Sequence, residues 1–558
     1  MSWKQEMEQV ELMRKLGKRM GGSEGVSRQR AQGRLTVRER IDLLVDPASF
    51  EEFGTTQGVA RYDEEDRLES FRPGSTVRGF GRIEGRSVLI SGQDFTIRGG
   101  ATDGMVAWRN RGSTALAQEF RLPMIKLLDG AGGSVRTGGT KGKSAEAGSI
   151  VHHSAVQEED KPVDLGQTGV PGSFDLPREF EPKEVMPSQR DDLANGLAEG
   201  HVLAKVPVVS AVLGSVAGGP AVEVGNCHFS VMTKNSETFV GGPPMVKQAL
   251  GVDMTKYELG NYRVQAKAAG AVHNVAEDEA DAMDQIRRFL GYLPSSVWQL
   301  PPRQNPTDDP NRRDESLLST IPRDRRQIHD VRKLIGVVVD QESTFEISTL
   351  YGRALVTMLA RMDGFPVAVM ANDCRFNGGA MTPSACIKME RFVDFANTFH
   401  LPLVYFCDVP GFMVGLQSEQ DGIIRFANRA MFAVEEATIP YITIVTRRLY
   451  GVAARSAKSN GLGVRYAWPS AESGALVAEG GVMAAYRRDI ESAADPEARR
   501  RELEARFIRM ASVVRQPGIA MEIIDPRDTR PAVIDYIRKS HGVNATQLGP
   551  KIRVGMRP

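Results

Sequence analysis

The sequence predicts an α/β protein made of two related domains in tandem. Residues 81–135 are similar to residues 360–414 without a gap, at a constant separation of 279 residues. Gly85 aligns with Gly364, and Asp129 aligns with Asp408. This separation is far longer than the roughly 20–50 residues of a solenoid repeat, so each copy is expected to be a whole domain.

An alternation of strands and helices supports the α/β class. Residues 86–91 and 123–129 are predicted as buried strands, with a helical stretch from about 102 to 120 between them. The second copy repeats this order with a strand at 366–371, a helix at 384–400 and a strand at 402–408. Such alternation is typical of βαβ crossovers and predicts a largely parallel, buried sheet.

A third predicted strand in each copy locates an insertion. Residues 206–213 precede a glycine-rich turn, and residues 439–446 precede its counterpart. These landmarks are 233 residues apart, so the first copy has 46 extra residues before this strand. The extra residues fall at about 152–192, which are rich in proline, glycine and charge and predict a long loop or lid.

The predicted domain boundaries follow from these landmarks. We expect an N-terminal domain at residues 1–300, a polar linker at 301–328 and a C-terminal domain at 329–558. Residues 1–45 are predicted to be helical and include a basic stretch that contains Arg34 and Arg38. A solvated helix face is one interpretation of this stretch, and an arm that holds a polyphosphate is the alternative.

Composition narrows the class of protein. The 558 residues have a formal net charge of +1, which argues against a general nucleic-acid binder. The four cysteines form no C-x-x-C pair, so we expect neither a zinc ribbon nor a disulfide framework. No apolar run approaches the length of a membrane span, and no secretory signal is recognisable. We therefore expect a soluble cytoplasmic protein without a metal.

Glycine-rich turns are the main candidates for a functional site. A turn from a strand into a helix leaves backbone N–H groups unpaired, and these suit an oxyanion or a phosphate. One interpretation is that the glycines only allow tight turns and close packing. Their duplication in register favours paired oxyanion holes instead. The candidates are Gly99, Gly100, Gly218 and Gly219 in the first copy, and Gly378, Gly379, Gly451, Val452 and Ala453 in the second.

Other motifs give weaker signals. The chain has no full Rossmann fingerprint, no P-loop and no G-x-S-x-G elbow. A metal-binding role for the His152–His153 pair is the less favoured interpretation. Asp340 and Asp408 follow apolar strands, where they would serve either as catalytic carboxylates or, as we favour, as structural caps.

Motifs spread over most of the chain resemble one enzyme family. They include Arg34-Leu-Thr-Val-Arg-Glu-Arg, Gly214-Ser-Val-Ala-Gly-Gly-Pro-Ala, Val339-Asp-Gln-Glu-Ser-Thr-Phe-Glu-Ile, Phe406-Cys-Asp-Val-Pro-Gly-Phe and Tyr466-Ala-Trp-Pro-Ser-Ala-Glu. Together they are similar to the carboxyltransferase (β) subunit of biotin-dependent acyl-CoA carboxylases, the group that contains propionyl-CoA and methylcrotonyl-CoA carboxylases. The resemblance implies two crotonase-like ββα-superhelix domains.

The resemblance also implies partners. It implies a ring-shaped homohexamer in which the N-terminal domain of one subunit faces the C-terminal domain of another. Acyl-CoA is expected on the former and carboxybiotin on the latter. The chain has no Ala-Met-Lys-Met biotinylation motif and no ATP-binding glycine loop. Biotin is therefore expected on a separate carrier protein, together with a separate biotin carboxylase subunit.

The implied reaction needs two oxyanion holes. Carboxybiotin releases CO2, the freed ureido nitrogen takes the acyl α-proton, and the enolate attacks CO2. Negative charge develops on an enolate oxygen and on a ureido oxygen, and each needs preorganised donors. We expect Gly218 and Gly219, helped by Gly99 and Gly100, to stabilise the enolate.

Two departures from the family pattern concern the substrate. The family's Tyr-Gly-Gly-Ala-Tyr-Asp is here Tyr450-Gly-Val-Ala-Ala-Arg, so Arg455 replaces an acidic residue near the acyl pocket. The family's Asp-Ser-Gly-Gly-Ala-Arg is here Asp129-Gly-Ala-Gly-Gly-Ser-Val-Arg. The alternative functions are a decarboxylase or transcarboxylase component, and a non-catalytic scaffold paralogue. The sequence does not identify the acyl group.

Overall fold

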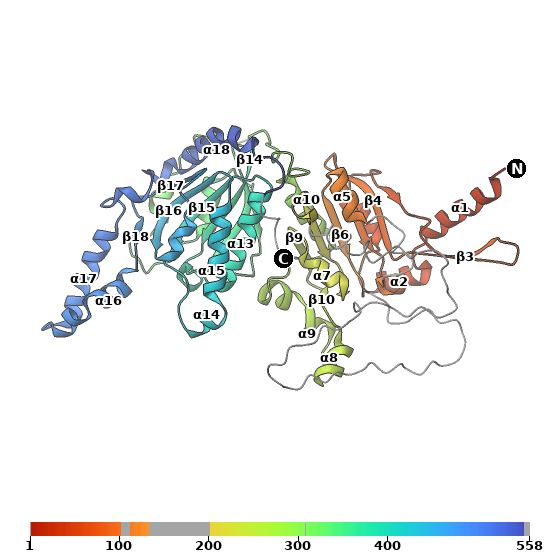
Figure 1. Ribbon diagram of the computed structural model, residues 1–558, viewed down its shortest axis with the longest axis horizontal. Coiled ribbons are helices and arrows are strands. Elements are labelled where there is room, and N and C mark those ends of the chain that lie inside the picture. The colour runs from red at the N-terminus through yellow and green to blue at the C-terminus, as the bar shows by residue number, and fades with distance from the viewer. Residues whose placement is uncertain (1, 102–111, 133–200, 307, 552–558) are drawn as a thin grey trace, which may run out of the picture.

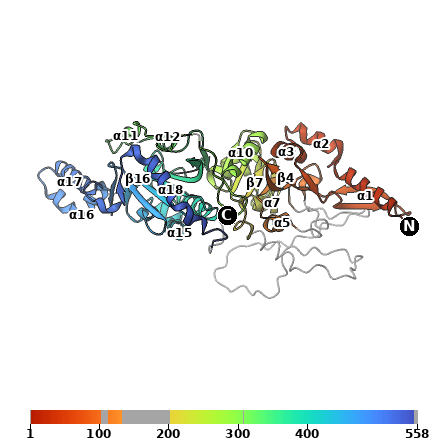
Figure 2. The ribbon, with the colours of Figure 1, turned by 90° about the horizontal axis from the view of Figure 1, so that it is seen from above.

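The molecule is elongated and contains two sheet domains (Figure 1). The computed structural model describes residues 2–101, 112–132, 201–306 and 308–551. Helix α1 (Lys4–Gly17) lies at one end, and a hairpin of α16 (Ala478–Ser492) and α17 (Pro496–Ala511) lies at the other (Figure 2). The predicted insertion at 152–192, with His152 and His153, falls outside the described residues.

The first sheet has seven strands in the order β1-β4-β5-β6-β7-β9-β11. Their bounds are Glu51–Phe53, Thr76–Ile83, Arg86–Gln93, Met124–Leu128, Val208–Val212, Phe229–Thr233 and Asn274–Ala276. Strand β4 pairs antiparallel with β1 and β5, and the remaining pairs are parallel. Two small sheets pair β2 (Gly58–Tyr62) with β3 (Leu68–Pro73), and β8 (Ser215–Ala217) with β10 (Glu237–Phe239).

The second sheet repeats the arrangement of the first. Its main order is β12-β13-β14-β15-β16-β17-β19, with bounds Phe345–Ile347, Leu355–Met362, Phe365–Asn372, Leu403–Val409, Tyr441–Tyr450, Gly463–Ala467 and Glu522–Ile523. Strand β18 (Glu472–Gly474) pairs with the end of β16, as β10 pairs with β8. The predicted tandem α/β fold is confirmed. The prediction omitted the antiparallel hairpin in each copy, whose turn is too short for a parallel crossover.

Helices cover the sheets. The first domain has α2 (Gly22–Ala31), α3 (Val37–Leu44), α5 (Ser113–Phe120), α7 (Gly219–Gly225), α8 (Pro243–Leu250), α9 (Lys256–Gly260) and α10 (Glu279–Gly291). The rest of the chain adds α11 (Leu317–Thr320), α12 (Val331–Val338), α13 (Pro383–Thr398), α14 (Leu416–Gln420), α15 (Ile423–Glu436) and α18 (Thr529–Ala545). The helix predicted at 384–400 is α13. Of the helix predicted at 102–120, residues 113–120 form α5, and residues 102–111 fall outside the described part.

The two domains share one hydrophobic core. Phe229 of β9 stacks on Phe289 of α10 with ring centroids 4.7 Å apart. Phe289 stacks in turn on Phe395 of α13, at 5.6 Å. The cluster that contains these rings continues into both sheets. The orientation of the second domain on the first therefore depends on buried aromatic packing.

Candidate functional site: paired glycine turns

The first copy places its predicted glycines at two turns. Gly99 and Gly100 have positive φ angles of 65° and 70°. A side chain on Gly100 would approach the carbonyl oxygen of Asp129 to 2.5 Å, so this turn packs tightly on the end of β6. Gly218 has φ 67° and ψ −132°, a conformation open in practice only to glycine, and α7 begins at Gly219.

The second copy reproduces both turns. Gly378 and Gly379 have φ angles of 61° and 82°. Gly451 has φ 63° and ψ −156°, and a 3₁₀ helix begins at Val452. Val452 is not among the residues with positive φ, so glycine at 451 takes the demanding conformation and a branched side chain is tolerated at 452.

Three backbone N–H groups at these turns remain available. Gly219, Val452 and Ala453 donate no hydrogen bond to any residue that the structure describes. A side chain on Gly219 would meet no described atom within 4 Å. Val452 is exposed. Gly219 and Val452 thus offer donors at exposed positions, the arrangement that an oxyanion hole requires, whereas Ala453 is buried.

Short contacts hold the two turns of each copy in fixed relation. In the first copy, the N–H of Ala131 donates to the carbonyl of Gly99 at 3.1 Å, and that of Ala217 donates to Gly130 at 3.0 Å. In the second copy, Arg448 on β16 donates through Nη2 to the carbonyl of Gly378 at 2.6 Å. Both turns of a copy therefore lie at the same end of its sheet, on either side of the strand between them, which is β6 in the first copy and β15 in the second.

Asp408 anchors the turns of the second copy. Its carboxylate accepts hydrogen bonds from Arg447 Nη2 at 2.7 Å and from Arg448 Nε at 2.6 Å. Burial by itself would raise the pKa of Asp408, but hydrogen bonds and charges from Arg448 and Arg447 outweigh it and hold the pKa at about 2. A carboxylate so completely paired is a poor proton acceptor, which favours the structural role.

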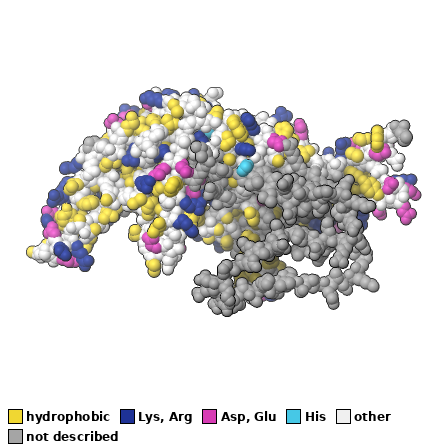
Figure 3. All heavy atoms as spheres, in the orientation of Figure 1, with side chains coloured by type: hydrophobic (Ala, Val, Ile, Leu, Met, Phe, Trp, Pro, Cys, Tyr) yellow, Lys and Arg dark blue, Asp and Glu magenta, His cyan; other side chains and the backbone are white. Residues whose placement is uncertain are grey.

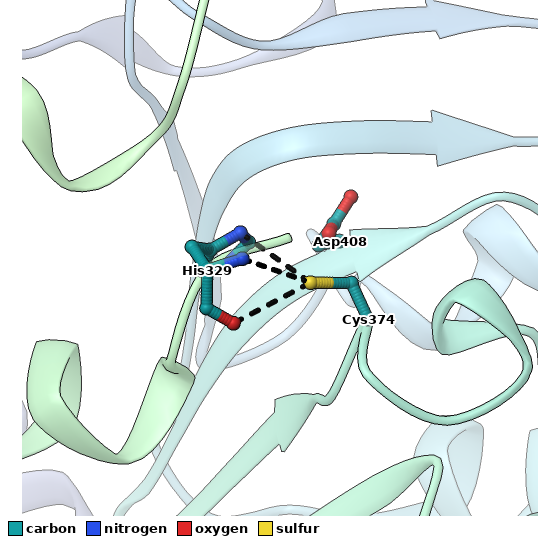
Figure 4. Close-up of side chains that lie close together, drawn as sticks. All are labelled: His329, Cys374 and Asp408. Atoms are coloured by element: carbon teal, nitrogen blue, oxygen red, sulfur yellow. Dashed lines mark hydrogen bonds between the residues drawn. The ribbon is translucent and has the colours of Figure 1, made fainter. Parts of the chain in front are cut away.

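His329 and Cys374 lie beside Asp408 (Figure 4). The three candidate ligand atoms are within 4.8 Å of one another, and all three residues are buried. Cys374 Sγ lies 3.5 Å from His329 Nδ1. The two arginines already engage both oxygens of Asp408, and their charge disfavours a cation. This cluster is therefore better explained as the support of the Asp408 anchor than as a metal site.

Two other candidate residues, Arg38 and Asp340, belong to a framework of ion pairs and turn caps that occurs in both copies. Arg38 of α3 forms a bidentate pair with Glu52, at 2.7 and 2.8 Å. Arg332 of α12 pairs with Glu346 in the same way. Both pairs connect a helix to the edge strand that follows it, at an identical spacing. The position of Arg38 is thus framework geometry, and its predicted contact with phosphate would have to compete with Glu52.

Asp340 belongs to the same framework. It accepts hydrogen bonds from the N–H groups of Asp363 and Gly364, at 3.0 and 2.8 Å. Asp46 accepts from Glu84 and Gly85 at the equivalent hairpin turn of the first copy. Asp340 is a turn cap rather than a carboxylate that faces a ligand.

The remaining predicted arginines have acidic neighbours. Arg34 Nη2 lies 3.9 Å from Glu237 and is mostly buried. Arg455 is exposed and forms an ion pair with Glu435 at the end of α15. Among the described residues, neither arginine forms a hydrogen bond or ion pair with the glycine turns, so their predicted roles stay predictions.

Sequence reasoning missed the arginines that hold Asp408. The available signal was the doublet Arg447–Arg448 at the end of an otherwise apolar strand. Two adjacent cations there require a buried counter-charge, and Asp408 at the end of the neighbouring strand supplies it.

Comparison with known proteins decides the family. Residues 28–157 and 197–546 match the model of the carboxyl transferase domain. The chain belongs to the carboxyl transferase family. The carboxyltransferase subunit of propionyl-CoA carboxylase from Haloferax mediterranei is 31% identical over 525 residues, which are 93% of this chain and 92% of that protein.

Other relatives of the carboxyl transferase family differ in the direction of the reaction. The methylmalonyl-CoA decarboxylase subunit alpha of Veillonella parvula is 31% identical over 93% of this chain and 92% of its own length. The transcarboxylase 12S structure, a hexamer with methylmalonyl-CoA bound, superposes with a TM-score of 0.79 at 28% identity, over 97% of this chain and 96% of that one. This chain is therefore an acyl-CoA carboxyltransferase of the biotin-dependent carboxylase and transcarboxylase type.

The structure also bears on membrane association. Among the described residues, no helix is both long enough and apolar enough to cross a membrane.

Proposed function

We propose that this chain transfers CO2 between carboxybiotin and the α-carbon, or a vinylogous carbon, of an acyl-CoA, with biotin borne by a separate carrier protein. The observation that supports this assignment is the pair of glycine turns in each copy. The free N–H groups of Gly219 and Val452 belong to exposed residues, which suits a ligand that develops negative charge on oxygen.

The first-copy turns receive the acyl-CoA in this proposal. The N–H of Gly219, with the Gly99–Gly100 turn beside it, donates to the thioester oxygen as the enolate forms. These donors are fixed by the strand ends and need no reorganisation during the reaction, which is the condition for large transition-state stabilisation. Arg34 and Arg38 remain the proposed contacts for the phosphates of CoA.

The second-copy turns receive the biotin ring. Val452 and Ala453 donate to the ureido oxygen, and the Gly378–Gly379 turn forms the opposite wall. When bound, carboxybiotin supplies CO2 and then a basic ureido nitrogen. The chain itself contributes orientation and the exclusion of water, because a fixed near-attack geometry replaces a bimolecular encounter.

Exposed apolar side chains support the homohexamer. Val240 lies next to the Gly218 turn, whose N–H donates to the Val240 carbonyl, and it is 78% exposed. Val414 and Leu416, near the second-copy turns, are 81% and 75% exposed. In Figure 1, α8, α9 and α14 lie along the same lower edge of the molecule. We propose that this edge of one subunit faces that of another, so that two different copies complete each site.

Two alternatives remain. The decarboxylase or transcarboxylase alternative uses the same site with different partner subunits, and the similarity to relatives of both kinds keeps it open. The scaffold alternative depended on Val452 and Arg455. Because Gly451 rather than Val452 adopts the positive φ angle, the turn keeps its form, which favours catalysis.

The test uses the purified chain with methylmalonyl-CoA and free biotin. We expect biotin-dependent formation of propionyl-CoA, which is the transfer run in reverse, at a rate below that for the preferred acyl-CoA. A screen of acyl-CoAs with the native complex, by bicarbonate-dependent ATP use, then identifies the preferred substrate. Bound acyl-CoA without transfer to biotin under any of these conditions would support the scaffold alternative.

The first-copy hole makes a specific prediction. Gly219→Val places a branched side chain over the free N–H in space that is otherwise open, so the protein should fold. We expect kcat to fall roughly a hundredfold, the scale for losing one oxyanion donor, with little change in CoA binding. The control is Gly336→Val on α12, which also meets open space. Equal turnover of the two variants would remove Gly219 from the site.

A further inference from the structure

A small cavity lies between the two domains, beside α13, and none of the glycine turns lines it. It has a volume of about 20 Å³, above the ~10–15 Å³ that one water-sized species needs. Its lining includes His228 and His273 from the first domain and Tyr351, Lys388, Arg391 and Phe395 from the second. The cavity is therefore part of the contact that orients one domain on the other.

The lining contains two basic side chains, Lys388 and Arg391, and burial lowers the pKa of Lys388 to about 7. Neither aspartate nor glutamate occurs among the described residues that line the cavity. Lys388 Nζ uses its three donors on the carbonyl oxygens of Ser348, Tyr351 and Leu355, at 2.7, 3.1 and 2.8 Å. Lys388 is therefore satisfied without an acid, and Arg391 is the cation left to consider.

Arg391 is incompletely paired. Its Nη1 donates to the carbonyl oxygen of Gly270 in the first domain at 3.1 Å. Its Nε and Nη2 atoms are buried and have no hydrogen-bond partner in the described part of the chain. The acidic neighbour Glu390 instead engages Arg429. A guanidinium remains charged in proteins, so two of its buried donors require an acceptor.

The two histidines do not supply that acceptor. His228 uses both ring nitrogens, since Nδ1 accepts from the N–H of Val208 at 3.0 Å and Nε2 lies 2.9 Å from the carbonyl of Leu203. His273 Nδ1 accepts from the N–H of Ser230 at 3.0 Å. Its other nitrogen then carries the proton in the neutral ring, which is a donor and not an acceptor.

We infer that the cavity binds one small monovalent anion, of the size of chloride, on the Nε–Nη2 edge of Arg391. This edge presents two parallel N–H donors, which suit one halide or the two oxygens of a small carboxylate. The small volume favours an ion of this size over phosphate or sulfate. A bound anion neutralises the guanidinium and strengthens a contact that already links α13 to Gly270 of the first domain.

Thermal unfolding of the full-length protein tests the inference. Sodium gluconate, whose anion is too large for the cavity, is replaced by sodium chloride at constant ionic strength. We expect a saturable rise in Tm of roughly 2–4 °C, because a ligand that binds only the folded state stabilises it. Sodium formate and sodium bicarbonate in separate series show whether small oxyanions replace chloride.

Matched variants localise the effect. Arg391→Met removes the donors and keeps the apolar stem, so the chloride response should be lost. Arg429→Met on α15 removes an arginine that already has an acidic partner, and its response should match that of the unmodified protein. An equal chloride response in both variants would overturn the assignment to this cavity.

Crystals grown in sodium bromide give a readout that does not depend on a folded variant. We expect an anomalous peak in the cavity, within hydrogen-bond distance of both Arg391 donors. Density there without anomalous signal would identify a water molecule and overturn the inference, even if the carboxyl transfer reaction proceeds normally.

Discussion

At the scale of single residues, the glycines needed for their backbone angles are not the residues whose N–H groups are free to bind a ligand. Gly218 and Gly451 hold backbone angles that other residues rarely adopt, whereas Gly219 and Val452 are the donors beside them. The sequence predicted these turns because glycine doublets recur in register. It did not distinguish a glycine required for its φ angle from one required for open space, because both requirements select the same residue.

Arg455 gives a prediction at this scale. A fixed positive charge near the acyl end would attract a carboxylate or polar tail, so we expect weak activity on acetyl- and propionyl-CoA. Arg455→Asp should shift the ratio of kcat/KM towards short chains by about 1–3 kcal/mol, the value of a charge-assisted hydrogen bond. The measurement is kcat/KM for a series of acyl-CoAs.

The exposed pair with Glu435 supplies the control. Glu435→Gln frees Arg455 and leaves its charge in place, so it should not favour short chains. If unmodified enzyme is efficient on propionyl-CoA and neither variant changes any ratio, Arg455 is only part of the surface charge.

At the scale of elements, the sequence predicted the strands better than the ion pairs and turn caps that hold them. Strands β5, β6, β14 and β15 have the predicted positions, because buried apolar runs bounded by glycine and proline indicate strands directly. The equivalence of α3 with α12 was missed. Its two ion pairs and two turn caps share one geometry, and residues 37–46 match residues 331–340 at five of ten positions. This match lies at a separation of 294 residues, so a comparison at the fixed separation of 279 does not find it.

The Asp408 anchor gives a pH prediction. Its pKa of about 2 lies below the ordinary value of 3.8, so the carboxylate stabilises the fold fully above about pH 4. That contribution, roughly 2 kcal/mol, is lost as the pH falls from about 4 to 2. Urea unfolding midpoints measured across this range should show the loss.

Asp408→Asn should remove much of this pH dependence and destabilise the protein at neutral pH by about 3–5 kcal/mol, because Arg447 and Arg448 lose a buried partner. Asp489→Asn serves as the control, since its pair with Arg499 is substantially exposed. A pH profile for Asp408→Asn that matches the control would contradict the anchor.

At the scale of the whole molecule, the surface indicates assembly. Figure 3 shows hydrophobic side chains among the charged ones on the second domain, including where α14 lies. We expect light scattering to give six times the mass of one chain. Leu250→Asp, on the exposed apolar edge, should reduce both the mass and the transfer rate, because two copies complete each site in the proposed hexamer.

Leu318→Asp is the matched control, because Leu318 is also exposed but lies on α11, which packs against α12. A hexamer that persists with full activity in Leu250→Asp would place the interface elsewhere. No single-chain pattern in the sequence predicts these contacts, since exposed apolar residues are ordinary unless they gather on one face.

The aspartate at position 129 recurs at position 408, and the two copies neutralise its charge in different ways. Asp129 takes its counter-charge from Arg40 of α3, at 2.8 Å, whereas Asp408 takes its own from the neighbouring strand. The equivalent of Arg447 is Gly214, where even a methyl group would lie 2.1 Å from the Asp129 carboxylate. The position of the arginine and the position of the space that holds it therefore both differ between the two copies. The halves are therefore not interchangeable modules: a chimera that joins one half's strand to the other half's helix would place either three arginines beside the aspartate or none.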